Sequence, residues 1–173
     1  MARTLTRKFT NRFPGDGGQW RGYYKDLADA GLTPDVKTGI SHAPAPADVA
    51  ALLGSDGDVL QRARIMGETG GTTYQLATSY FTPAVVAAIP RLAEQDTGPG
   101  GMYALMEEHH SLRQDEHLST PVATAEEAHA LGLREGDRVI RSVRITRSET
   151  DGTVLEVTVA AMNPDLNVIE FAN

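Results

Sequence analysis

The spacing of apolar residues predicts short helices and β-hairpins that alternate irregularly along the chain. Apolar side chains at helical spacing, closed by a glycine, indicate helices, whereas strict alternation indicates strands. Helices are expected at residues 19–31, 47–54, 83–89, 101–110 and 124–133, and strands at 58–66, 72–81, 111–123, 138–149, 153–162 and 166–172. Because no strand–helix–strand unit repeats and the connections are tight, the pattern predicts an α+β fold with an antiparallel sheet.

Local signals support individual elements. Thr124 and Glu127 have the spacing of a capping box, and Gly132 stands where that helix should end. An Asp-Gly pair at 151–152 lies between two alternating runs, which is a strong hairpin signal. Residues 1–18 end in the turn-forming run FPGDGG, so we expect a linker or a loosely docked arm there, followed by one domain over residues 19–173.

Composition excludes several classes of protein. The chain of 173 residues contains no cysteine, which rules out disulfides, thiolate catalysis and cysteine metal sites. No apolar run approaches the ~20 residues that a membrane-spanning helix needs, and no apolar core of a signal peptide follows the basic N-terminus. We therefore expect a cytoplasmic protein with no membrane partner.

Charge is distributed unevenly along the chain. Residues 1–25 hold six basic residues and one acidic residue, whereas the remainder holds ten basic and twenty-two acidic residues. Affinity for the phosphate backbone of nucleic acids needs clustered Lys and Arg, so the acidic body argues against a nucleic-acid-binding surface. The basic lead-in is expected to be a solvated linker.

A long stretch of the sequence resembles a known family. VATAEEAHALGLREGDRVIRSVRITRSETDGTVLEVTVAAMNPD resembles the UTRA ligand-binding domain of GntR-type bacterial transcriptional regulators, in the actinobacterial form of the HutC subfamily. In that family an ATxEEAxxLGLxxG run is followed by a strand and a DGxPxE hairpin. Upstream, QRARIMGETGGTTYQLATSYFTP is similar to the family's first strand pair. The resemblance covers residues 58–171 and implies a chorismate-lyase-like fold, with a central antiparallel sheet, flanking helices and an effector pocket between them.

The resemblance also implies a function in effector sensing. Family members carry a winged helix-turn-helix before this domain, and the few residues ahead of the FPGDGG run cannot supply one. The implied partners are a small-molecule effector, a second copy in a homodimer, and operator DNA only through the winged helix-turn-helix. Two alternatives stay open: an enzyme of the chorismate lyase type, which shares the fold, and a headless protein that captures full-length regulators by dimerising with them.

Two arginines mark the first candidate site. Arg62 and Arg64 lie on the same face of a predicted strand, about 7 Å apart. Two converging guanidinium groups suit a carboxylate or a phosphate held by paired hydrogen bonds. Such a pair also occurs on solvated faces, but the matching arginines contact phosphate in relatives that sense phosphosugars, and the resemblance therefore favours a pocket.

The strand at 153–162 offers a second candidate wall. Alternation puts Glu156, Thr158 and Met162 on one face and Val157 on the other. A carboxylate and a hydroxyl beside small apolar groups suit a polar ligand that is not wholly ionic. Glu156 matches a glutamate that hydrogen-bonds the effector in some relatives, and a structural pairing of Glu156 with an arginine is the alternative.

The resemblance adds four further pocket residues, which are Thr78, Tyr80, Gly101 and Tyr103. Gly101 stands at a predicted helix start, where free backbone N–H groups favour an anion. Many relatives have a phosphate-binding serine there, so its absence weakens a phosphosugar assignment. Tyr103 suits a pocket wall, although tyrosines on apolar helix faces more often belong to the core.

The expected effector is a small amphiphilic metabolite, such as an organic acid or a signalling lactone. Ala77, Ala161 and Met162 stand where many relatives have larger polar or aromatic groups, which indicates an apolar end to the pocket. His109, His110 and His117 lie among acidic residues without the spacing of a metal motif, and a solvated helix end is expected. No GxSxG motif or fixed acid pair is present. We predict no catalytic residues, no metal and no cofactor.

Overall fold

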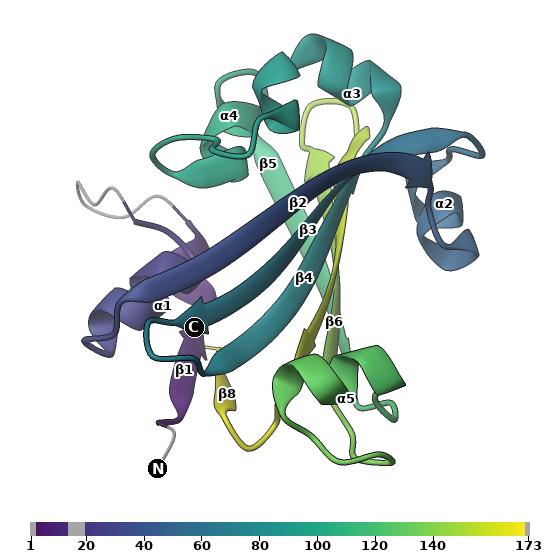
Figure 1. Ribbon diagram of the computed structural model, residues 1–173. Helices are drawn as coiled ribbons and strands as arrows, with labels where there is room; N and C mark the ends of the chain where they lie inside the picture. Colours follow the sequence, from purple (N-terminus) through teal and green to yellow (C-terminus); the bar gives the residue numbers. More distant parts are fainter. Residues whose placement is uncertain (1–2, 14–19, 172–173) are drawn as a thin grey trace.

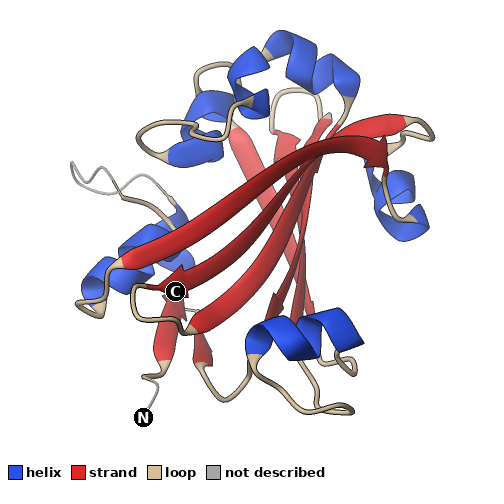
Figure 2. Ribbon diagram, in the orientation of Figure 1, coloured by secondary structure: helices blue, strands red, loops and turns tan. Residues whose placement is uncertain are grey.

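The computed structural model describes residues 3–13 and 20–171 and contains a six-stranded antiparallel sheet flanked by short helices (Figures 1 and 2). This arrangement confirms the predicted α+β fold. The strand order is β2-β3-β4-β7-β6-β5. The strand bounds are β2 Pro34–Pro44, β3 Asp58–Glu68, β4 Thr73–Phe81, β5 Leu112–Ser119, β6 Ile140–Ser148 and β7 Val154–Met162.

Short helices and a small second sheet surround this main sheet. The second sheet pairs β1 (Leu5–Lys8) with β8 (Asn167–Glu170) in parallel, so a strand from near each end of the chain lies beside the other (Figure 1). The helices are η1 Phe9–Arg12, α1 Tyr23–Asp29, α2 Ala47–Leu53, α3 Pro83–Ala88, η2 Pro90–Ala93, α4 Gly101–Glu107 and α5 Ala125–Leu131. None of the helices in the described ranges is long and apolar enough to cross a membrane.

The two faces of the main sheet are covered differently. The face that carries Arg64 and Thr158, here called the inner face, is covered at one end by α3, η2 and α4 and at the other end by β1 and α1. The opposite, outer face packs against α2 and α5. Figure 1 shows α1 and α4 on one side of the sheet and α2 and α5 on the other. The inner face is therefore closed at its two ends and hollow between them.

The two predicted hairpins and the five predicted helices are present. The Thr124 hydroxyl accepts a hydrogen bond from the Glu127 N–H at 3.2 Å, and the Glu127 carboxylate accepts one from the Thr124 N–H at 3.0 Å, which completes the capping box. Gly132 ends the helix at a φ of 66°. Glycine adopts this left-handed conformation without the steric cost that a Cβ atom imposes.

The sequence reading missed strand β2. Its eleven residues form an edge of the sheet, with Val36, Thr38 and Ile40 partly buried on the inner face and the residues between them exposed. Pro34 and Pro44 lie at its two ends, where an edge strand tolerates a missing N–H donor. Only two strongly apolar residues alternate here, so the signal was weaker than in the central strands.

The prediction of a loose arm is wrong for residues 5–12. Leu5 is fully buried, and its N–H donates to the carbonyl of Leu166 at 2.8 Å. Arg7 and Asn11 are also buried and both donate to the carboxylate of Asp26. Local pattern could not reveal this docking, because the partners are distant in sequence. Residues 14–18 of the predicted linker lie outside the described residues.

In its described part, residues 3–13 and 20–25, the basic lead-in is also not a solvated linker. Five of the six basic side chains there pair with carboxylates. The pairs are Arg7 with Asp26, Lys8 and Lys25 with Asp29, Arg12 with Glu116, and Arg21 with Glu107.

Candidate ligand-binding site

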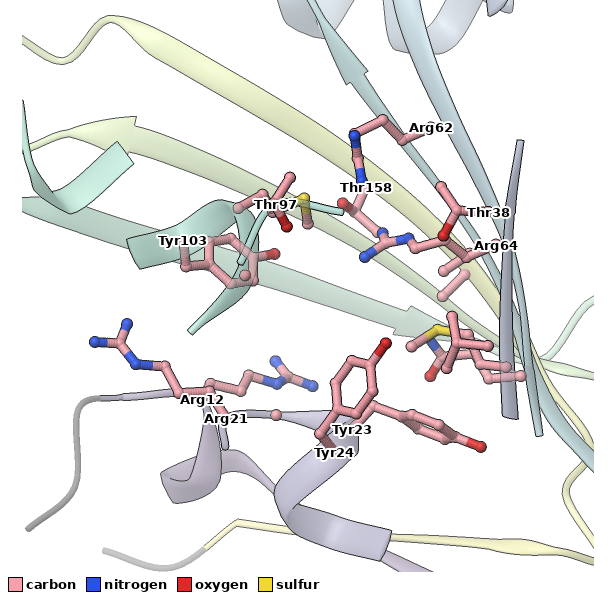
Figure 3. Close-up of a pocket in the computed structure, with 18 of the residues that line it drawn as sticks. Arg12, Arg21, Tyr23, Tyr24, Thr38, Arg62, Arg64, Thr97, Tyr103 and Thr158 are labelled. Carbon is pink, nitrogen blue, oxygen red and sulfur yellow. The ribbon is translucent and has the colours of Figure 1, made fainter. Parts of the chain in front are cut away.

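A cavity of about 640 Å³ lies over the inner face, between its two covered ends. Its floor is formed by β2, β3, β4, β7, β6 and β5, and its walls by residues 20–24 of the α1 region, residues 95–103 and the docked segment with Arg7 and Arg12. Figure 3 shows side chains from these separate elements pointing into one space. Such a volume falls in the range of sites for small organic molecules.

Strand register sets the order of side chains on the floor. One row across five strands reads Arg62, Ser79, Thr158, Arg144 and Glu116. Small side chains therefore occupy the middle strands, and long charged side chains rise from the strands on either side of them. This arrangement leaves open space above the middle of the sheet.

Arg62 is used to hold backbone. Its guanidinium donates to the carbonyl of Leu92 at 2.7 Å, to that of Gln95 at 3.1 Å and to that of Glu94. The residue is 3% exposed, and burial together with the neighbouring Arg64 lowers its pKa to about 10. Arg62 thus fixes the chain that runs from η2 toward α4 over the cavity.

Arg64 points into the cavity. Figure 3 places its guanidinium near the hydroxyl groups of Tyr24 and Tyr103. One nitrogen, Nη2, donates to the Ser79 hydroxyl at 2.6 Å, and Nε is buried without a partner among the described residues. Burial lowers the pKa of Arg64, and Tyr103 and Glu156 oppose that effect. The guanidinium therefore keeps unused donors on the cavity side.

Glu156 lies under the cavity floor and is fully buried. Its carboxylate accepts hydrogen bonds from Thr146 at 2.7 Å, from Tyr103 at 3.3 Å and from the Thr158 hydroxyl. The Thr158 hydroxyl is in turn 2.6 Å from that of Ser79, which links Glu156 to the floor beneath Arg64. The predicted carboxylate and hydroxyl are thus brought together, with Glu156 behind Thr158 rather than in the cavity lining.

Tyr103 closes the wall opposite β3. Burial raises the pKa of its phenol to about 12, against the opposing charge of Arg144. The phenol is therefore neutral at physiological pH and donates to Glu156. A neutral phenol contributes a hydroxyl and an aromatic ring to the wall.

Sequence reasoning missed Arg144 on β6. Its guanidinium lies 5.2 Å from the centroid of the Tyr103 ring, and its Nε is buried without a partner in the described part of the chain. A signal was available, because β6 alternates Ser142, Arg144 and Thr146 with apolar residues, and the Asp-Gly hairpin fixes Arg144 opposite Thr158.

The other predicted residues divide between the two faces. Gly101 and Met162 line the cavity together with Arg62, Arg64, Tyr103 and Thr158. Thr78 and Tyr80 do not, because they alternate with Ala77 and Ser79 on β4 and face the outer side, where Tyr80 packs in the cluster under α2. Their assignment to the pocket is wrong, and so is that of Ala161, which packs against α5.

A glycine loop forms one rim of the cavity. Gly98, Gly100 and Gly101 have φ values of 77°, 76° and 67°, which side chains rarely adopt. A Cβ atom on Gly100 would lie 2.7 Å from that of Ala104, so a side chain is excluded there. The Gly101 N–H donates to the carbonyl of Gly98 at 3.0 Å and is not free for a ligand.

The end of the cavity nearest α1 is apolar and aromatic. Val36, Met66, Ala77 and Met162 line its floor, and Tyr24 lines the wall above them. Tyr24 stacks on Trp20 with ring centroids 5.4 Å apart. Arg7 and Gln75 also line this end, where Arg7 lies 3.7 Å from the Met162 sulfur and is paired with Asp26. The cavity thus presents Arg64 and Arg144 at one end, and at the other mainly apolar side chains beside a guanidinium that is already paired.

Metal ligation has no support in the geometry. Within residues 3–13 and 20–171, no three His, Cys, Asp or Glu side chains gather closely enough to hold a metal ion. Near the predicted histidine cluster, Glu107 pairs with Arg21 at 2.7 Å instead.

Comparison with known proteins places this fold and cavity in one class, that of the effector domains of transcriptional regulators. The sequence profile of the UTRA domain matches residues 31–166, and the chain therefore belongs to the UTRA domain family. The match begins upstream of the 58–171 stretch that carried the resemblance, and it includes the β2 strand.

Individual relatives agree with this assignment. An HTH-type transcriptional regulator of Streptomyces coelicolor, SCO4628, is 35% identical over 127 residues, which make up 69% of this chain and 46% of that protein. The chain thus spans less than half the length of this curated relative.

Two solved structures show the same fold. The effector domain of PhnF from Mycobacterium smegmatis superposes with a TM-score of 0.70 at 22% identity, covering 90% of this chain and 96% of that one. A candidate GntR-family transcriptional regulator gives a TM-score of 0.78 at 19% identity, covering 100% of this chain and 70% of that one.

Proposed function

We propose that this domain senses a small organic acid with an apolar body, and that occupancy of the cavity controls DNA binding by a winged helix-turn-helix of the same regulator. The observation that carries the proposal is the division of the cavity into an end with the Arg64 guanidinium and an end at Met66 and Met162, where the one guanidinium in contact, that of Arg7, is already paired with Asp26. An anionic head and an apolar tail match these two ends.

The docked N-terminal segment supplies a route from the cavity to the preceding chain. Arg12 and Tyr24 line the cavity, and Arg12 is held by Glu116 across the cavity mouth. A ligand that contacts these residues changes the stability of the docked segment. Such control requires that the ligand bind the docked and undocked states with different affinity.

The compartment, subfamily, oligomeric state and mode of regulation are proposed from the relatives of this domain. We infer a cytoplasmic regulator of the HutC subfamily that acts as a homodimeric repressor, since two-fold assembly matches a palindromic operator. Light scattering on the domain should give the mass of a dimer. A monomer at high protein concentration would contradict this part of the proposal.

A thermal-shift screen tests the proposed function. A ligand that binds only the folded state raises the melting temperature by mass action. We expect the largest increases from organic acids with apolar bodies, and smaller ones from sugar phosphates and neutral lactones. Best hits among the sugar phosphates would contradict the proposed ligand class.

A further inference from the structure

We propose that the cavity grips the carboxylate of a singly charged acid between Arg64 and Arg144, and that Arg62 positions the covering backbone without touching the ligand. This inference rests on the proposed function and names the contacting pair and the charge of the ligand. The pair joins strands β3 and β6 across the floor of the cavity.

Unused hydrogen-bond donors are the first support. A guanidinium carries five N–H donors. Within the described residues the guanidinium of Arg144 lies over the Tyr103 ring and makes no side-chain hydrogen bond of ordinary geometry, and the guanidinium of Arg64 donates to Ser79. The Nε atoms of both arginines, like that of Arg62, are buried without partners there. The terminal nitrogens distinguish the residues: those of Arg62 donate to three carbonyls, whereas Arg64 uses one of its two for Ser79. A carboxylate in the cavity can accept hydrogen bonds from the terminal nitrogens that remain.

The guanidinium groups of Arg64 and Arg144 lie close enough for one charge to affect the other. The charge of Arg144 lowers the pKa of Arg64, after the larger effect of burial. Arg144 lies opposite Thr158 in the sheet, and Thr158 lies opposite the Ser79 to which Arg64 donates. Arg64 itself stands in the neighbouring row, opposite Ala77, and its side chain reaches over to Ser79. The short side chains of Ser79 and Thr158 therefore lie between its guanidinium and Arg144, which leaves room for a carboxylate above them.

The balance of charge selects a monoanion. Among the charged residues that line the cavity, Arg7, Arg12 and Arg21 are each paired with a carboxylate. The remaining cations are Arg62, Arg64 and Arg144, and the remaining lining carboxylate is Asp96 on the exposed rim. Glu156 does not line the cavity, but its charge lies directly beneath Thr158 of the floor and is counted with them. Three cations against two anions leave one positive charge, which one carboxylate neutralises. A phosphate dianion would leave an excess negative charge beside the buried Glu156.

Arg62 differs from Arg64 in what it already contacts. Its two terminal nitrogens donate to three backbone carbonyls at Leu92, Glu94 and Gln95. These contacts hold the segment that leads to the glycine loop at the cavity rim. Arg62 is therefore a positioning residue, although it lies only two residues from Arg64.

Calorimetric titration with three probes of equal chain length tests the proposal: octanoate, octanamide and octyl phosphate. The wild-type domain should bind octanoate roughly ten- to a hundred-fold more tightly than octanamide, because charge-assisted hydrogen bonds distinguish the two head groups. It should also bind octanoate more tightly than octyl phosphate.

Variants separate the roles of the three arginines. Arg64→Gln and Arg144→Gln should each remove most of the preference for octanoate over octanamide while leaving octanamide affinity nearly unchanged. Arg62→Gln should weaken both ligands by the same factor and keep the preference. Arg113→Gln, on an exposed arginine of β5, is the matched control and should change neither affinity. If melting curves show that Arg144→Gln does not fold, Arg144→Lys should retain part of the preference.

Four outcomes would overturn the proposal. They are an unchanged preference in Arg144→Gln, a lost preference in Arg144→Lys, tighter binding of octyl phosphate than of octanoate, and no binding of octanoate to the wild type. The last outcome leaves the proposed function standing if the metabolite screen still finds an effector, so the two failures can be distinguished.

Discussion

The guanidinium of Arg144 stacks over the ring of Tyr103, 5.2 Å from its centroid, while the hydroxyl of the same tyrosine donates to Glu156. One side chain thus contacts both a cation and an anion that belong to different strands of the sheet. Because Tyr103 also lines the cavity, its protonation state matters for the site and can be tested by pH.

Replacing Tyr103 should change how stability depends on pH. Burial raises its pKa to about 12, so between pH 10 and 12 the unfolded chain loses a proton that the folded domain retains. The neutral phenol of Tyr103 therefore makes its full contribution to the free energy of unfolding below pH 10, and this contribution is lost as the pH rises through 12. Urea unfolding at pH 9 and pH 11 measures how much the free energy of unfolding falls over this interval. For Tyr103→Phe this decrease should be roughly 1 kcal/mol smaller than for the wild type. An equal loss in the two proteins would show that the phenol is not buried in this way.

Replacing Asp26 should loosen the docked N-terminal segment. Its carboxylate accepts hydrogen bonds from Arg7 at 2.9 Å, from the Lys8 N–H at 3.1 Å and from Asn11 at 2.8 Å. Asp26→Asn leaves the Arg7 charge buried without a counter-ion, and such losses typically cost about 3–5 kcal/mol. Asp29→Asn, on a half-exposed carboxylate of the same helix, should cost no more than about 0.5 kcal/mol. Similar costs for the two variants in urea unfolding would contradict this account of the docking.

Sequence patterns predicted most strands of the sheet and most helices because the spacing of apolar residues within each element is visible in the sequence. The hairpins at Gly70 and Gly152 and the capping box at Thr124 are local, and each formed where its signal lies. The docking of Leu5 and the edge strand β2 depend on distant partners or on few apolar residues, and local pattern missed both.

The candidate site was predicted only in part for the same reason. Alternation along one strand correctly grouped Glu156, Thr158 and Met162 on one face. Whether the terminal nitrogens of Arg62 or those of Arg64 are occupied depends on the carbonyls that the 92–95 backbone brings near, and no spacing rule contains that information. Thr78 and Tyr80 alternate with Ala77 and Ser79 along β4, so their side chains lie on the opposite face of the sheet from the cavity. The alternation pattern could have prevented this error.

The domain alone should not bind DNA. Five of the six basic residues of its N-terminal segment are used in ion pairs with carboxylates, so they are less available to displace counter-ions from phosphates. A mobility-shift assay at physiological salt should show no complex. Submicromolar binding with a steep salt dependence would contradict this expectation.

The domain should also not convert chorismate to 4-hydroxybenzoate and pyruvate, although it shares the fold of that lyase. Arg62 is held by backbone carbonyls and Glu156 by three hydroxyl groups, so neither is free to act on a bound substrate. Chromatography of an overnight incubation should find no 4-hydroxybenzoate. Release of 4-hydroxybenzoate that Arg64→Gln abolishes would establish an enzyme.

The most direct test is a crystal structure of the domain with the acid that raises its melting temperature most. We predict density for the acid over the inner face, with its carboxylate at Arg64 and its apolar part against Met66 and Met162. An acid bound elsewhere, for example in the shallow groove between Gly71–Thr73 and His129–Gly132, would contradict the assignment of this cavity as the sensing site.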